Sequence, residues 1–170
     1  MKSRQSAMKS DALLKLKGVY RTPGHLIRRA QQIGVAIFMD ELAEYGITPV
    51  QFASLIAIRD NPGIDQKSLG RLIAIDRSTV ANVLSGLEKK KLICRIVPAH
   101  NQRIKQLFTL ATGNELLADA QDSVFRVQER ILAPLTGEEA ETFTRLLNKI
   151  VVGNNSVSRA PLDSEIDRSE

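Results

Sequence analysis

The sequence predicts a mainly α-helical protein that carries one small β-hairpin. Three observations lead to this fold class. Apolar residues recur every three or four positions over most of the chain, helix-capping signals precede these stretches, and only residues 92–110 are rich in strand-forming side chains. With 170 residues, 43% of them hydrophobic, the chain is long enough to bury a core. We therefore expect a single folded domain.

The first two predicted helices are separated by a clear stop and a clear start. The first helix spans about residues 25–45, and Gly46 follows it as a natural helix stop. Thr48 can cap the next helix, and Gln51 can reach back to complete a capping box. This second helix should run to about Asp60.

Two further helices are predicted to be joined by a tight turn. Asp65 caps a short helix over about residues 66–73, and Asp76 caps another over about residues 77–91. A short helix, a tight turn and a second helix form a helix-turn-helix, which places its second helix in the major groove of DNA. A hairpin within residues 92–110 would stand behind this unit as a wing.

The last part of the chain is predicted to form two long helices. Thr112 and Glu115 have the spacing of a capping box, and a helix should run from there to about Leu132. Its apolar residues alternate steps of three and four, as in the seam of a coiled coil. A last helix starts near Thr136, and the polar residues 154–170 are expected to be disordered.

Positive charge is concentrated in two stretches of the chain. Residues 1–30 contain eight basic residues and one acidic residue, and residues 66–110 contain nine and two, a net charge of +7 in each stretch. The second stretch coincides with the helix-turn-helix and the hairpin. Basic side chains there would neutralise phosphates and release counterions. This coincidence favours DNA binding over an ordinary solvated basic face.

The second helix of the helix-turn-helix has an outward face suited to reading bases. Val80, Leu84 and Leu87 must face the core, which leaves polar residues outward. Arg pairs with guanine, Asn with adenine, and Ser with base edges or phosphates, while an Arg at the wing tip can enter the minor groove. The predicted DNA-contacting residues are Gln66, Lys67, Ser68, Arg77, Ser78, Thr79, Asn82, Ser85, Lys89, His100, Asn101, Gln102 and Arg103.

The order and spacing of several short motifs resemble the MarR family of bacterial transcriptional regulators. These motifs lie at residues 47–52, 64–66, 69–70, 76–80, 87–93 and 101–103, and the likeness covers roughly residues 25–153. The resemblance implies a winged helix-turn-helix homodimer. Two departures concern the wing: Asn101 stands where the family usually has Asp, and Thr109-Leu110 stands where a Leu-Thr pair is usual.

The resemblance also implies how the chain is organised and what it does. We expect a basic arm at residues 1–22, one MarR-like domain at 23–153 and a disordered tail at 154–170. Within the domain, residues 47–110 would form the DNA-binding lobe, and residues 23–46 and 111–153 the dimerisation helices. The expected function is a cytoplasmic, sequence-specific regulator, in most members a repressor, that binds a pseudo-palindromic operator in double-stranded DNA. The alternative is an architectural DNA-binding protein without a ligand response.

The effector predicted for this regulator is a small aromatic carboxylate. Residues 21–29 resemble regulators of aromatic-acid catabolism, including nicotinate-type pathways. Members with such effectors bind them between the dimerisation helices and the DNA-binding lobe, where Arg would hold the carboxylate and apolar walls the ring. The candidate ligand residues are His25, Arg28, Arg29, Phe38, Tyr45 and Phe52. Dimer packing or phosphate contact is the alternative role for these residues.

Other function classes receive little support from the sequence. There is no Cys-x-x-Cys, Gly-rich phosphate loop or His-Glu-x-x-His motif, so we expect no enzyme, no metal and no cofactor. No apolar run approaches the roughly 18 residues of a membrane span, and the N-terminus lacks the pattern of a secretory signal. Cys94 is the single cysteine, which fits a reducing cytoplasm and favours a packing role over a redox switch.

Overall fold

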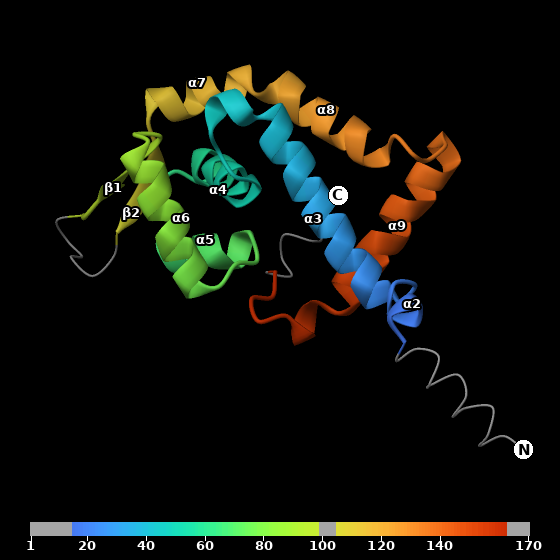
Figure 1. Ribbon diagram of the computed structural model, residues 1–170. Coiled ribbons are helices and arrows are strands. Elements are labelled where there is room, and N and C mark those ends of the chain that lie inside the picture. Colours follow the sequence, from blue (N-terminus) through green and yellow to red (C-terminus); the bar gives the residue numbers. More distant parts are fainter. Residues whose placement is uncertain (1–14, 99–104, 163–170) are drawn as a thin grey trace, which may run out of the picture.

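The computed structural model describes residues 15–98 and 105–162 of the chain (Figure 1). These residues confirm a mainly α-helical fold with one antiparallel hairpin. The elements are α2 (Leu16–Val19), α3 (Pro23–Glu41), the 3-10 turn η1 (Ala43–Tyr45), α4 (Pro49–Asp60), α5 (Gln66–Leu72), α6 (Arg77–Lys89), β1 (Ile93–Ile96), β2 (Gln106–Thr109), α7 (Ala111–Asp119), α8 (Gln121–Leu132), α9 (Gly137–Gly153) and the 3-10 turn η2 (Asn155–Val157).

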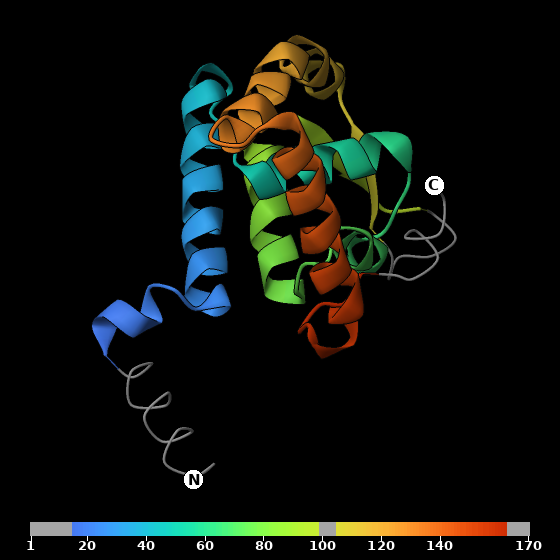
Figure 2. The ribbon, with the colours of Figure 1, turned by 90° about the vertical axis from the view of Figure 1, so that its right-hand side faces the viewer.

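The helix-turn-helix and the hairpin form one lobe of the molecule. In Figure 1, α4, α5, α6 and the two strands gather on one side, and α7 and α8 lead away from the hairpin across the top. The strands pair with Ile93 opposite Thr109 and Ile96 opposite Gln106. Figure 2 shows α3 (blue) as an upright rod beside this lobe and α9 (orange-red) as a second rod in front of it. The architecture is therefore a winged lobe attached to a frame of long helices.

The core of the lobe is made by the apolar faces of α4, α5 and α6 with the hairpin. Its fully buried side chains include Leu55 and Ile58 of α4, Leu84 and Leu87 of α6, and Leu107 of β2. Burying a side chain of this size contributes roughly 1.5–3 kcal/mol each relative to exposure. This packing fixes which face of α6 remains outward.

Helix starts follow the predicted capping signals closely. The Thr48 side chain accepts from the Gln51 N–H while the Gln51 side chain accepts from the Thr48 N–H, so the predicted capping box is confirmed. Thr136 and Glu139 form a second capping box at the start of α9. Gly46 ends η1 with φ 58°, a left-handed conformation that glycine adopts without steric cost.

The predicted capping box of Thr112 and Glu115 is wrong. Helix α7 follows Leu110 without a side-chain cap, and the Thr112 hydroxyl donates instead to the Lys91 carbonyl oxygen. The reason is local geometry: Lys91 has φ 57°, and its carbonyl faces the start of α7 rather than continuing α6.

Two further expectations about the C-terminal half are corrected. The single long helix divides at the buried Ala120 into α7, which packs on α4, and α8, which packs on α3. The chain also remains structured beyond residue 154. Here the Asn155 side chain donates to the Leu162 carbonyl and accepts from the Leu162 N–H, which closes a loop.

Ion pairs join α3 to α8 at one end of the frame. Arg126 donates to Glu41 at 2.9 Å, and Arg130 reaches both Asp40 and Glu41 at 2.6 Å. Hydrogen bonds from Arg126 and then Arg130 hold the pKa of Glu41 below its ordinary value. No helix in the described ranges is long and apolar enough to cross a membrane.

Candidate nucleic-acid interface

Helix α6 has a buried apolar face and an outward polar face. Val80, Val83, Leu84 and Leu87 are buried, as the sequence predicts for three of them. Opposite these, the side chains stand outward at helical spacing. Arg77, Ser78, Ala81, Asn82 and Lys89 are exposed, and Thr79 and Ser85 are half-buried. An exposed face of this kind, with small Ala81 between longer polar residues, can approach base edges closely.

Asp76 organises the N-terminal end of α6. Its carboxylate accepts from the backbone N–H groups of Ser78 and Thr79, both at 3.0 Å, and from their hydroxyls. These hydrogen bonds, with that of the Ser78 hydroxyl the strongest, hold the pKa of Asp76 far below its ordinary value. The hydroxyl protons of Ser78 and Thr79 are therefore already donated, so toward any further partner their oxygens can act only as acceptors.

Asp65 has the same role at the start of α5. It accepts from the N–H groups of Lys67 and Ser68, and the Ser68 hydroxyl donates to it at 2.7 Å. Burial raises the pKa of Asp65, but hydrogen bonds from Ser68 and Lys67 lower it by more, so its pKa lies below the ordinary value. Lys67 and Ser68 are exposed and Gln66 is half-buried, so all three line the surface beside α6.

Helices α5 and α6 cross at very short range. A Cβ on Gly70 would lie 3.0 Å from the Ile75 carbonyl oxygen and 3.1 Å from the Val80 side chain, so glycine permits this approach. The turn between the helices places Ala74 at φ 53°. The close crossing fixes α6 rigidly against α5, which is the geometry that a helix-turn-helix requires.

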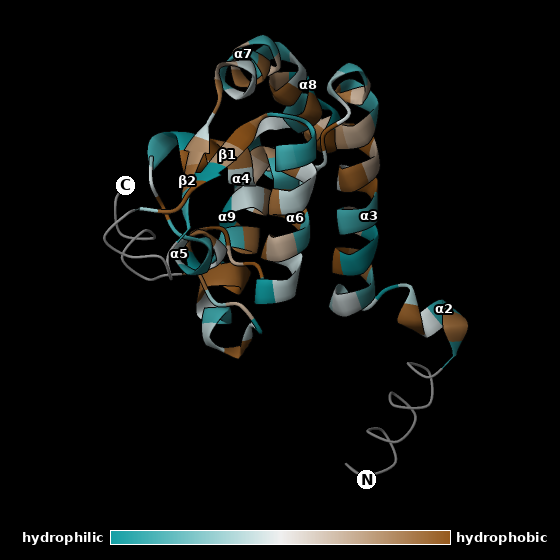
Figure 3. Ribbon diagram, turned by 90° about the vertical axis from the view of Figure 1, so that its left-hand side faces the viewer, coloured by the Kyte–Doolittle hydropathy of each residue, from teal (hydrophilic) through white to brown (hydrophobic). Residues whose placement is uncertain are grey.

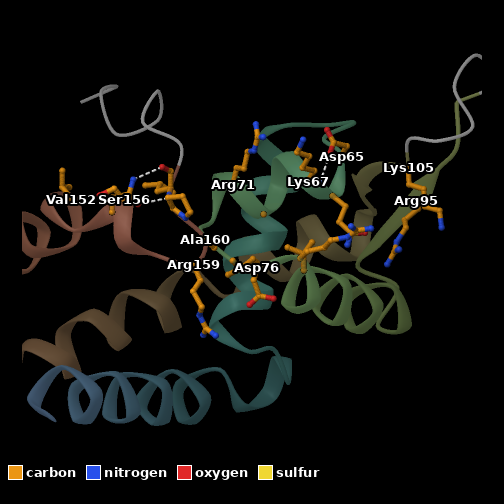
Figure 4. A pocket seen from close by; sticks show the side chains of 18 residues that line it. Asp65, Lys67, Arg71, Asp76, Arg95, Lys105, Val152, Ser156, Arg159 and Ala160 are labelled. Carbon is orange, nitrogen blue, oxygen red and sulfur yellow. Dashed lines mark hydrogen bonds between the residues drawn. The ribbon is translucent and has the colours of Figure 1, made fainter. Parts of the chain in front are cut away.

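A groove of about 1480 Å³ runs along this crossing, and we call it the basic groove (Figure 4). It is lined by α5, the N-terminal end of α6, Arg95 and Lys105 toward the tip of the hairpin, the end of α9 and the loop 155–162. Its cationic side chains are Lys67, Arg71, Arg77, Arg95, Lys105 and Arg159. The only carboxylates among its lining residues are Asp65 and Asp76, which are both engaged as helix caps. Such a surface favours a polyanion.

Four cations of the basic groove were not among the predicted contacts. Arg71, Arg95 and Lys105 belong to the basic stretch 66–110, and its charge could have identified them. Arg95 also pairs with Glu88 at 2.7 Å, which ties β1 to α6, and its Nε atom has no partner in the described part of the chain. Arg159 belongs to a segment that was expected to be disordered, so nothing in the sequence indicated it.

The predicted wing-tip contacts cannot be placed. His100, Asn101, Gln102 and Arg103 lie outside the described residues. The strands that lead to them end near the basic groove, because Arg95 and Lys105 both line it. Those four contacts remain predictions.

The structure separates the six candidate ligand residues into two groups. Phe38 and Phe52 pack edge to face with ring centroids 5.8 Å apart, and the Tyr45 hydroxyl donates to the Asp119 carbonyl. His25, Arg28 and Arg29 lie at the other end of α3. Thirteen residues of helix between His25 and Phe38 span about 20 Å. One chain therefore does not bring the cations to the aromatic group.

These features define a winged helix-turn-helix DNA-binding protein. The sequence model of the MarR family matches residues 47–105, which include the helix-turn-helix and the first strand of the wing. The transcriptional regulator HosA of Escherichia coli O157:H7 is 32% identical over 127 residues, which cover 75% of this chain and 93% of HosA. The chain therefore belongs to the MarR family of transcriptional regulators, whose members are DNA-binding regulators and not enzymes.

Two solved structures are similar over most of the chain. The transcriptional repressor CouR bound to a 23-mer DNA duplex has a TM-score of 0.72 at 26% identity, covering 81% of this chain and 98% of CouR. Bordetella bronchiseptica BpsR, whose DNA binding is regulated by 6-hydroxynicotinic acid, has a TM-score of 0.70 at 27% identity, covering 77% and 94%. Within the described residues, no group of three or more His, Cys, Asp or Glu is placed to hold a metal ion.

Proposed function

We propose that this chain is a homodimeric repressor that binds a pseudo-palindromic operator and is released by a small aromatic carboxylate. The observation that supports operator binding best is the outward polar face of α6. It lies opposite the buried apolar face of the same helix and beside the basic groove. The DNA-bound repressor CouR, with a similar fold, supports the same reading.

Base reading is assigned to α6 and phosphate contact to the groove. Asn82 lies in the middle of the exposed face, where its amide suits adenine. Arg77 and Lys67 lie nearer the basic groove, where they would meet the DNA backbone. In a two-fold dimer, the two α6 helices would enter major grooves about 34–36 Å apart.

The dimer is proposed from apolar side chains that no part of the described chain covers. Helix α9 exposes Phe143, Leu146, Leu147 and Ile150, and α3 exposes Leu26, Ile27 and Ile33. Figure 3 shows hydrophobic bands along α3. We assign dimerisation to residues 23–46 and 111–153, and DNA binding to residues 47–110.

The proposed effector rests on the regulation of BpsR by 6-hydroxynicotinic acid, an aromatic carboxylic acid. In this chain, Phe38, Phe52 and Tyr45 pack against the core between α3 and the lobe. The cations Arg28 and Arg29 lie at the far end of α3. A ligand held by both groups therefore requires α3 of a second copy of the chain.

The test is DNA affinity at about 0.15 M salt. The protein should bind the intergenic DNA upstream of its own gene roughly 10³-fold more tightly than a scrambled duplex. N82A should lose about 1–3 kcal/mol on the specific duplex alone, whereas the matched variant N114A on α7 should bind as the parent does. Equal affinity for both duplexes would indicate an architectural protein instead. If aromatic acids at millimolar concentration leave the affinity unchanged, the effector proposal is refuted while operator binding stands.

A further inference from the structure

The loop 155–162 brings the end of the described chain to the DNA-facing side. Its two Asn155–Leu162 hydrogen bonds, at 2.9 and 2.8 Å, close the loop on itself. Ser156, Arg159, Ala160 and Leu162 line the same basic groove as the predicted DNA contacts on α5 and α6 (Figure 4). The chain therefore leaves the described structure at the edge of a surface that we assign to DNA phosphates.

The sequence that follows this loop is strongly acidic. Residues 163–170 contain four acidic residues and one basic residue, and we call them the acidic segment. Asp163, Glu165 and Asp167 alternate with uncharged residues, a spacing that puts three carboxylates on one side of an extended chain. Acidic segments of this kind often interact with basic surfaces.

We propose that the acidic segment binds the basic groove of its own chain and competes there with DNA phosphates. The proposal rests on the proposed DNA-binding function. Charge complementarity carries it, because six cations line the groove against only two carboxylates among its lining residues, Asp65 and Asp76, and five of these cations remain when Arg95 is set aside for its ion pair with Glu88. The segment acts as an intramolecular inhibitor that lowers the affinity for every DNA duplex, because phosphate contacts do not depend on sequence.

Connectivity strengthens this competition. The acidic segment begins directly after Leu162, which itself lines the groove, and eight extended residues reach at most about 26–29 Å. A tether this short gives an effective concentration on the order of millimolar. Weak individual contacts then suffice to keep the groove occupied. The apparent affinity for DNA equals the intrinsic affinity multiplied by the fraction of molecules whose groove is free.

The first test neutralises the segment without shortening it. The variant D163N/E165Q/D167N/E170Q should bind both specific and scrambled duplexes roughly tenfold more tightly than the parent at about 50 mM salt. This difference should shrink as salt screens the contact. The matched variant S164A/S169A keeps every charge and should bind as the parent does. Unchanged affinity of the neutralised variant, or equal tightening by the control, would overturn the proposal.

A second test detects the contact between the acidic segment and the groove directly, first in the protein without DNA. A nitroxide spin label on I166C, in the C94A background, should broaden the amide resonances of Lys67 and Arg71, and added duplex should restore them. Absence of broadening overturns the inhibitor even if DNA binding is normal. Broadening in a protein that binds no duplex at all would instead support the contact and refute the proposed function, so the two failures are distinguishable.

Discussion

Gly113 lies where the base of the wing meets the first turn of α7, and replacing it with alanine tests this junction. A Cβ at this position would lie far inside 3.0 Å of the Leu92 carbonyl oxygen, and 3.3 Å from the Leu55 side chain. The same carbonyl accepts the Leu110 N–H at 2.9 Å. Both obstacles are buried, and one of them is backbone, so neither can move aside cheaply.

The cost of G113A can be worked out from these contacts. An alanine in a helix is ordinarily better than glycine by about 1 kcal/mol. Overpacking costs about 1–3 kcal/mol, and displacing the Leu92 carbonyl from its hydrogen bond costs about 1–3 kcal/mol more. We therefore expect the free energy of unfolding to fall by about 1–5 kcal/mol, against the ordinary preference for alanine.

Urea and thermal unfolding of G113A measure this directly. For a chain of this size the midpoint temperature should fall by roughly 2–20 °C. The matched control is G34A, because a Cβ there meets only the Ile131 side chain at an ordinary 3.7 Å. G34A should keep or gain stability by up to about 1 kcal/mol. A G113A protein as stable as the parent would refute the close contact between the wing and α7.

Three further changes probe backbone strain, capping and ion pairing. K91G should raise the free energy of unfolding by about 0.5–1 kcal/mol, because Lys91 has φ 57°, and a loss of stability in urea would contradict that strain. D65A should lose about 1 kcal/mol through the missing cap of α5, whereas D65N should lose less; equal losses would count against capping. E41Q should flatten the acid limb of the stability curve. The pKa of Glu41 is lowered in the folded protein, so its contribution is present above the ordinary value near 4.3 and is lost as pH falls through the folded value. An identical pH dependence in parent and variant would show that the contacts of Glu41 with Arg126 and Arg130 do not contribute to the free energy of unfolding.

Local signals predict the helix-turn-helix well because its starts are set by short-range chemistry. Asp65, Asp76 and Thr48 each cap the helix that the sequence assigns to them. The pattern Thr112–Glu115 has the same local form but fails, because α7 begins at Ala111 with Leu110 as its N-cap. Thr112 therefore lies inside the first turn, where its hydroxyl donates to the Lys91 carbonyl from 21 residues away. A sequence pattern does not show which partner a hydroxyl will meet across the fold.

The site was predictable where it depends on helix periodicity and not where it depends on long-range contacts. The outward residues of α6 follow from its buried face, which hydrophobic spacing identifies. The separation of Arg28 from Phe38 follows from the length of the helix that carries both, which the chemistry of the two side chains does not reflect. The approach of Arg159 to the groove depends on how α9 returns toward α5, and no local pattern encodes it.

The route by which a ligand between α3 and the lobe would alter DNA binding can be followed through the structure. Strand β2 leads through Leu110 directly into α7, which is fixed to the base of the wing at Gly113. Helix α8 continues from α7 and is tied to the C-terminal end of α3 by the Glu41 ion pairs. A shift of α3 relative to α4 must therefore be taken up either by Ala120, where α7 and α8 divide, or by movement of the whole lobe. In the proposed dimer, the distance between the two lobes must match the spacing of the major grooves, so even a small rotation at Ala120 in each copy would lower the affinity for the proposed operator by linkage.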